Sequence, residues 1–153
     1  MRAFHFGLES VLSLRKMKEE EALRRFISVK NLHQKKREAL DRIFETRRLA
    51  QEEMGAKEEG SVDVKTLLQY QRYLAGLVVQ IAAARAELVR LEKELAARRE
   101  ILTSATKDRK VMEKAKEKRF AEWREEFRRA EQKETDEVGT QIYLRDGDGE
   151  REP

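Results

Sequence analysis

The apolar residues between Leu67 and Met112 recur at alternating steps of three and four positions, and this spacing constrains the fold more than any other feature. The series is Leu67, Tyr70, Leu74, Leu77, Ile81, Ala84, Leu88, Leu91, Leu95, Leu102, Ala105 and Met112, with arginines at the two intervening positions, Arg98 and Arg109. Such a heptad pattern is typical of a helix that buries one narrow stripe against another helix. The sequence therefore predicts a coiled coil.

The composition favours a narrow stripe over a wide core. Charged residues make up 42% of the 153-residue chain and hydrophobic residues only 39%, whereas a globular domain carries about a quarter charged residues. The chain has one proline, at its last position, and seven glycines. Because these strong helix breakers are scarce, long stretches are free to be helical. We expect an all-α fold.

A first helix is predicted from about residue 8 to about residue 54, with Gly55 as its C-cap. Its apolar stripe is weaker and comprises Leu8, Val11, Leu12, Ala22, Phe26, Val29, Leu32, Ala39, Leu40, Ile43, Phe44 and Ala50. Two glycines, a serine and an aspartate indicate a turn at about residues 55–61. Asp63 or Ser61 is expected to cap a second, longer helix over about residues 62–137.

A short connection predicts that the two helices fold back as an antiparallel two-helix coiled-coil hairpin, one domain over residues 1–137. With the bend near residue 58, Leu8 should lie beside Asp108, and Phe4 and Phe6 near Met112. Residues 138–153 lose the periodicity and are rich in glycine and aspartate. We expect them to form a disordered acidic tail.

Two sets of residues are candidates for binding a partner. After Met112 the phase shifts to an aromatic stripe, Phe120, Trp123 and Phe127, with no obvious partner in the chain. This stripe either packs on Phe4 and Phe6, or on a second copy of the chain, or is a docking surface for another protein. Near the bend, the same choice applies to a second set: Tyr70, Leu74 and Leu77 on the seam, and Tyr73 and Val78 off it.

The residues of a catalytic or metal site are missing from the sequence. There is no cysteine, no GxSxG motif and no glycine-rich phosphate loop. His5 and His33 lie on different segments, without a cysteine, aspartate or second histidine at metal-ligand spacing. We expect no enzyme, no cofactor and no metal. The lack of cysteines, of a signal core and of a membrane-length apolar run fits a cytoplasmic protein.

Charge is distributed unevenly. Residues 67–116 contain 11 basic and 6 acidic residues, a net charge of +5, and residues 117–153 contain 8 and 12, a net charge of −4. A basic surface attracts nucleic acid or acidic proteins. Because the two signs are densely mixed, an ordinary solvated helix surface is the favoured interpretation and no nucleic-acid partner is expected. A weak nucleic-acid-binding coiled coil remains an alternative.

Three stretches resemble the FliJ family, a small soluble component of the bacterial flagellar type III export apparatus. They are the opening FHFGLESVLSLRKMKEEEA, the run LLQYQRYLAGLVVQI at the start of the second helix, and the late KRFAEWREEFRRAEQKETDE. The resemblance covers about residues 4–137. It implies an antiparallel coiled coil similar to the central stalk of rotary ATPases, with a role in flagellum biogenesis and therefore in motility and chemotaxis.

The resemblance also implies partners. Family members bind the hexameric export ATPase, promote its ring assembly, contact the membrane export-gate protein and escort export chaperones. The expected location is the cytoplasmic side of the membrane at the flagellar base. The gate candidates are Tyr70, Tyr73, Leu77 and Gln80; the ATPase candidates are Phe120, Trp123 and Phe127, with N-terminal contacts from Phe4 and Phe6. A stalk or scaffold of another type III secretion system is the alternative.

Overall fold

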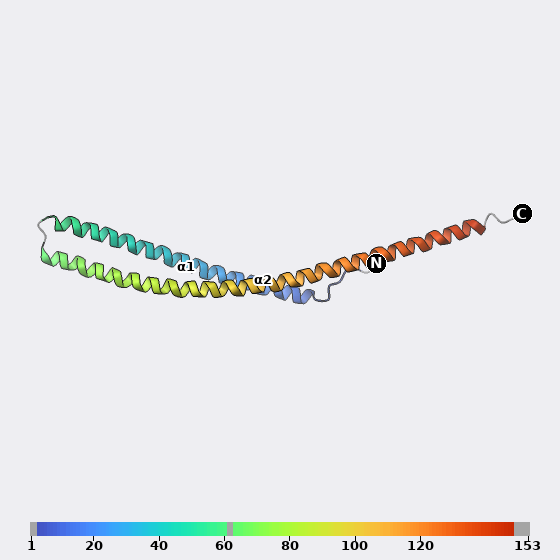
Figure 1. Cartoon of the computed structure of the whole chain (residues 1–153), viewed down its shortest axis with the longest axis horizontal. Coiled ribbons are helices and arrows are strands. Elements are labelled where there is room, and N and C mark those ends of the chain that lie inside the picture. The colour runs from blue at the N-terminus through green and yellow to red at the C-terminus, as the bar shows by residue number, and fades with distance from the viewer. Residues whose placement is uncertain (1–2, 61–62, 149–153) are drawn as a thin grey trace. The chain divides into compact units, whose positions relative to one another are not determined.

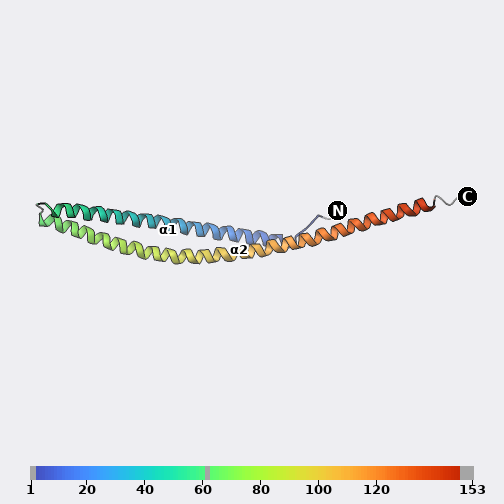
Figure 2. The same cartoon turned by 45° about the horizontal axis from the view of Figure 1, so that its top comes forward.

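Two long helices make up the fold in the computed structural model, which describes residues 3–60 and 63–148. Helix α1 spans Glu9–Glu58 and helix α2 spans Val64–Asp148. The two helices are antiparallel neighbours joined by a short bend (Figures 1 and 2). The predicted all-α helical hairpin is confirmed. Its residues fall into two compact units: the hairpin unit, Lys18–Thr106, and the terminal unit, which comprises the chain up to Met17 and from Lys107 onward.

The hairpin unit is held together by the predicted seam. Every α2 position of the 3-4 series from Leu67 to Leu102 is buried or half-buried, and Leu91 is completely buried. The other buried apolar residues of this unit are Ala22, Leu40, Ala50, Leu77 and Ile81. Because Ala22, Leu40 and Ala50 belong to the weaker stripe of α1, the two stripes pack against each other as expected.

Polar contacts join the two helices along the edges of the seam. His33 Nε2 lies 3.5 Å from the Glu92 carboxylate, and the guanidinium of Arg99 lies 5.7 Å from the centre of the Phe26 ring. These groups border the seam with their polar ends toward water, so each contact contributes little to stability. The apolar stripe is therefore the main source of stability in the hairpin unit.

The terminal unit is built around Leu12, which is 1% exposed, and Phe6, which is 6% exposed. The N-terminal segment ahead of α1 is not helical, and the amide of Glu9 donates a hydrogen bond to the carbonyl of Phe6 at 3.1 Å where α1 begins. Lys116 of α2 forms an ion pair with Glu9 at 2.8 Å. Phe6 and the first turns of α1 are therefore tied to α2 within this unit.

The pairing of the two helices differs from the register expected from the sequence. Asp108 forms its ion pair with Arg15 at 3.0 Å, whereas Leu8 was expected beside it, a displacement of seven residues. The cause is the position of the bend, since α1 continues to Glu58 and α2 begins at Val64. Moving a bend by about three residues displaces the facing positions by about twice as many. Because the displacement equals one heptad, the same two apolar stripes face each other across the seam.

Gly55 does not end α1, contrary to the prediction. It lies inside the helix, and its carbonyl accepts a hydrogen bond from the amide of Glu59 at 3.4 Å. A glycine in a helix costs only about 1 kcal/mol relative to alanine, and the following residues, including Lys57, are good helix formers. The predicted cap at Asp63 is present, because its carboxylate accepts a hydrogen bond from the Lys65 amide at 3.2 Å. Ser61 lies outside the described residues.

The C-terminal end of α2 also differs from the expectation. The sequence predicted a helix end near residue 137 and a disordered acidic tail over 138–153, but α2 continues to Asp148; residues 149–153 lie outside the described part of the chain. Without a regular apolar spacing this segment cannot bury a stripe against another helix, but it can still form a helix. With no proline before Pro153 and only two glycines after residue 137 and before residue 149, Gly139 and Gly147, the backbone hydrogen bonds continue. From Arg128 to Asp146 every side chain is exposed.

Candidate partner-binding surfaces

The aromatic cluster of the terminal unit consists of Phe4, Phe120, Trp123 and Phe127. Phe120 and Trp123 are stacked with their ring centroids 5.7 Å apart, and Trp123 is stacked on Phe127 at 5.5 Å. Phe4 meets Phe120 edge to face at 5.2 Å and lies 5.8 Å from Trp123. Of the alternatives left by the sequence, packing of the stripe on Phe4 is therefore observed. Phe4 does not lie beside Met112, because the register is displaced by one heptad.

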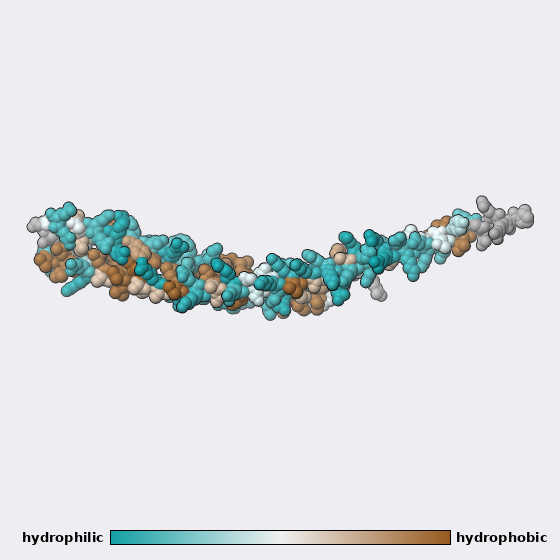
Figure 3. Space-filling view, in the orientation of Figure 1, coloured by the Kyte–Doolittle hydropathy of each residue, from teal (hydrophilic) through white to brown (hydrophobic). Residues whose placement is uncertain are grey.

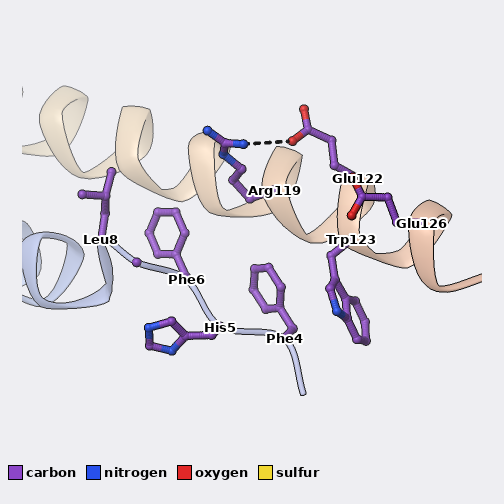
Figure 4. Close-up of a pocket in the computed structure, with 9 residues that line it drawn as sticks. Phe4, His5, Phe6, Leu8, Arg119, Glu122, Trp123 and Glu126 are labelled. Carbon is purple, nitrogen blue, oxygen red and sulfur yellow. Dashed lines mark hydrogen bonds and ion pairs between the residues drawn. The ribbon is translucent and has the colours of Figure 1, made fainter. Parts of the chain in front are cut away.

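Phe4 leaves part of the aromatic cluster accessible. Phe120 retains 43% exposure, and a hollow of about 490 Å³ lies between the N-terminal segment and α2, lined by Phe4, His5, Phe6, Gly7, Leu8, Arg119, Glu122, Trp123 and Glu126. Figure 4 shows the rings of Phe4 and Phe6 pointing toward α2 while His5 points away. Phe6 is buried, so it anchors the segment and is not available to a partner in this conformation.

Charged side chains border the aromatic cluster. Arg119 donates a hydrogen bond to Glu122 at 3.5 Å on the rim of the hollow. One turn further along α2, hydrogen bonding from Arg128 lowers the pKa of Glu125. These exposed pairs keep both signs of charge around an aromatic centre. That arrangement suits recognition of a protein surface with an apolar projection and a mixed polar rim.

The predicted gate residues occupy different environments near the bend of the hairpin unit. The Tyr70 hydroxyl donates a hydrogen bond to Glu53 at 3.3 Å, and Lys57 lies 4.9 Å from the centre of the Tyr70 ring. Hydrogen bonding with Tyr70 raises the pKa of Lys57. Tyr70 is therefore engaged in holding α1 and α2 together. Only part of its surface is left for a partner.

Tyr73, Leu77 and Gln80 are separated by burial. Leu77 is 5% exposed and belongs to the seam, so a partner cannot reach its side chain while the hairpin is closed. Tyr73 is 51% exposed, and Gln80 is also exposed. The accessible part of the predicted gate surface is thus formed by Tyr73 and Gln80, with Tyr70 at its edge.

A third surface, which the heptad spacing does not predict, lies on the other side of α2. Figure 3 shows hydrophobic residues gathered over the first part of this helix. The large exposed apolar residues there include Val78 at 55% and Val79 at 69%. The heptad spacing places Val78 off the seam, but it does not single out the neighbouring Val79. The signal that would have found them is the absence of any charged residue over positions 73–84 in a chain that is 42% charged.

A family model described as "Flagellar FliJ protein" matches residues 4–148 of the chain. The chain belongs to the FliJ family. The match covers both helices and all three surfaces, and it confirms the resemblance seen in the sequence motifs. No curated protein and no solved structure gives a significant match.

Membership of the FliJ family identifies the chain as a component of flagellar export and flagellum biogenesis. The family is one of non-catalytic proteins. In the described part of the chain, neither helix is long and apolar enough to cross a membrane. The same residues contain no group of three or more His, Cys, Asp or Glu side chains arranged to hold a metal ion. Protein binding is the chemistry that the three surfaces support.

Proposed function

We propose that this FliJ-family protein is a stalk that binds the hexameric flagellar export ATPase, promotes assembly of the ATPase ring and links the ring to the membrane export-gate protein. In this role it would lie at the cytoplasmic face of the membrane, at the flagellar base, held there by its partners, and it would also escort export chaperones. The observation that carries the proposal is the partly exposed aromatic cluster beside the hollow of the terminal unit.

The terminal unit supplies the ATPase contact in this proposal. Stacked aromatic rings offer a large and rigid apolar surface at low entropic cost, and such residues dominate the binding energy of protein interfaces. Phe120 is 43% exposed, and Trp123 and Phe127 are half-buried. Phe4 is the N-terminal contact that orients them, since its ring touches both Phe120 and Trp123.

The bend side of the hairpin unit supplies the gate contact. Tyr73 and Gln80 are exposed on α2, and Tyr70 lies beside them with its hydroxyl bound to Glu53. A tyrosine with an exposed ring and a neighbouring amide combines apolar contact with hydrogen bonding, as interface centres commonly do. Leu77 supports this surface from within the seam.

The ATPase contact is tested by binding of the purified chain to the purified export ATPase from the same organism. Phe127→Ala should weaken binding by about tenfold or more if the aromatic cluster is an interface centre. The matched control is Tyr143→Ala, which removes a 79%-exposed aromatic ring from the same helix and should leave binding unchanged. Equal affinity of the wild type and Phe127→Ala would contradict the assignment.

The gate contact is tested separately with the soluble portion of the export-gate protein. Tyr73→Ala should weaken this interaction and leave ATPase binding intact, because Tyr73 belongs to the hairpin unit and the aromatic cluster to the terminal unit. In the cell, deletion of the gene should abolish swimming in soft agar, and normal swimming would contradict the whole proposal.

A further inference from the structure

The outward face of α2 is apolar over several turns. Because each helical residue is rotated by about 100° from the last, one line of side chains runs opposite the seam: Leu68, Ala75, Val79, Ala82 and Ala86. All of them are exposed. Val78 and Val89 border this line, with exposures of 55% and 50%. These seven residues are called the outward face below.

Helix α1 does not cover the outward face, since it packs on the opposite side of α2 through Leu77, Ile81 and Leu91. In addition, α2 carries no charged residue on any of its sides over positions 73–84. A helix that is apolar on every side is ordinarily buried on every side, and a contiguous exposed apolar patch on a charged protein marks an interaction site.

Basic residues lie on the same line as the outward face: Arg72 lies between Leu68 and Ala75, and Lys93 follows Ala86 by seven residues. Lys65, Arg72, Arg85, Arg90 and Lys93 lie within residues 64–93, where the acidic residues are Glu87 and Glu92. Arg90 is neutralised by ion pairs with Glu87 at 2.7 Å and Glu94 at 3.4 Å. Arg72 and Lys93 take part in none of the ion pairs of the described residues, so their charges are available to a partner.

We propose that the outward face of α2 binds an amphipathic helix of another protein, one with an aliphatic stripe that has aspartate or glutamate at each end. A helix fits because the alanines at 75, 82 and 86 let a second backbone approach closely, while Val79 and Leu68 supply apolar area. Acidic residues at the two ends of that stripe fit because they would pair with Arg72 and Lys93. A second copy of the same face would instead bring basic residues together.

This interface is separate from the two contacts of the proposed function. It uses neither the aromatic cluster nor Tyr73 and Gln80, which lie toward the seam side of α2. An experiment can therefore disprove binding at the outward face without disproving the ATPase and gate contacts, and the reverse also applies.

The test uses the full chain and two synthetic helical peptides of about three heptads. Both carry leucine and isoleucine along one stripe; one has glutamate at the two ends of the stripe and the other has lysine there. Fluorescence anisotropy should show that the glutamate peptide binds at least about tenfold more tightly than the lysine peptide. Its affinity should fall as salt is raised.

Val79→Glu should weaken binding of the glutamate peptide by about tenfold or more, because it places a carboxylate at the centre of the stripe. The matched control is Val111→Glu on the same helix, where the valine is 65% exposed, compared with 69% for Val79, and lies between Lys110, Lys107 and Lys114. The control should bind as the wild type does. Circular dichroism should show equal helical content in all three proteins.

Three results would overturn the proposal. The first is equal binding of the glutamate peptide by the wild type and Val79→Glu. The second is equal binding of the lysine and glutamate peptides by the wild type. The third is a wild-type dimer in analytical ultracentrifugation that Val79→Glu dissociates and Val111→Glu does not, because a second copy would then cover the outward face.

Discussion

Thr106 donates a hydrogen bond from its hydroxyl to the carboxylate of Glu19 at 3.2 Å, joining α2 to α1 within the hairpin unit. This pair records the register of the hairpin directly. With a bend near residue 58, Glu19 would instead have faced the neighbourhood of Ala97. The two registers differ by about one heptad, so both bury the same apolar stripe.

Cross-linking separates the two registers. The sequence has no cysteine, so the double variant Glu19→Cys/Thr106→Cys contains no other thiol that could react. It should cross-link within one chain through a short bismaleimide reagent. Glu19→Cys/Ala97→Cys should not. Mass spectrometry of the monomer band identifies the linked peptides. Efficient linkage of the second pair and not the first would favour the register expected from the sequence.

Leu91 should be the most sensitive seam position of the hairpin unit, because it is 0% exposed. Leu91→Ala removes buried apolar surface and leaves a cavity, and should lower the free energy of unfolding by about 2 to 5 kcal/mol. Urea unfolding followed by circular dichroism measures the change. Leu49→Ala, at a leucine of α1 that is 47% exposed, is the control. The interpretation fails if the two variants lose the same stability.

Trp123 is the only tryptophan in the sequence, so its fluorescence reports on the aromatic cluster. Phe4→Ala removes the ring that lies 5.8 Å from it. The emission maximum should move to longer wavelength and acrylamide quenching should rise, because water gains access to the indole. His5→Ala, in the same segment with an exposed side chain, should change neither. An unchanged spectrum in Phe4→Ala would show that Phe4 does not cover Trp123 in solution.

The Glu87–Arg90 pair should make stability depend on pH. Hydrogen bonding from Arg90 lowers the pKa of Glu87, below an unfolded value of about 4.3. Its contribution is therefore present above that value and lost as the pH falls through the folded pKa. Glu87→Gln should have a slightly lower melting temperature than the wild type at neutral pH, and the difference should vanish in acid.

Glu100→Gln is the control for this pH dependence. Glu100 lies on the same helix and takes part in none of the ion pairs among the described residues. Its substitution should leave the melting temperature close to that of the wild type at both pH values. A difference between Glu87→Gln and the wild type that persists unchanged at about pH 3 would exclude the ion pair as its source.

The seam could be read from the sequence because burial follows a repeating spacing that side chains alone encode. Leu91, Ile81 and Leu77 are buried as the spacing required. The register could not be read so reliably, because it depends on where one glycine permits the chain to turn. Gly55 continues α1, and Gly60 follows its last residues, with its amide bonded to the carbonyl of Lys57 at 3.2 Å.

The candidate surfaces were only partly predictable. The aromatic stripe was evident from spacing, but its contact with Phe4 required the true register. Tyr73 and Leu77 are four residues apart and looked equivalent, yet one is 51% exposed and the other 5%. The outward face around Val79 lies opposite the heptad stripe, so the spacing that predicts the seam carries no information about it. The feature of the sequence that marks it is the interruption of the charge pattern over positions 73–84.

The bend between Glu58 and Val64 also bears on how the length of such a protein can change. Inserting one residue inside either helix rotates all following side chains by about 100° and carries them out of the seam. Insertions of whole heptads return the stripe to its place, whereas insertions of three or four residues shift its phase and change the local supercoil. An insertion within the bend itself leaves both stripes intact. Length variation among natural homologues is therefore expected to fall at the bend, or within the helices in paired whole heptads.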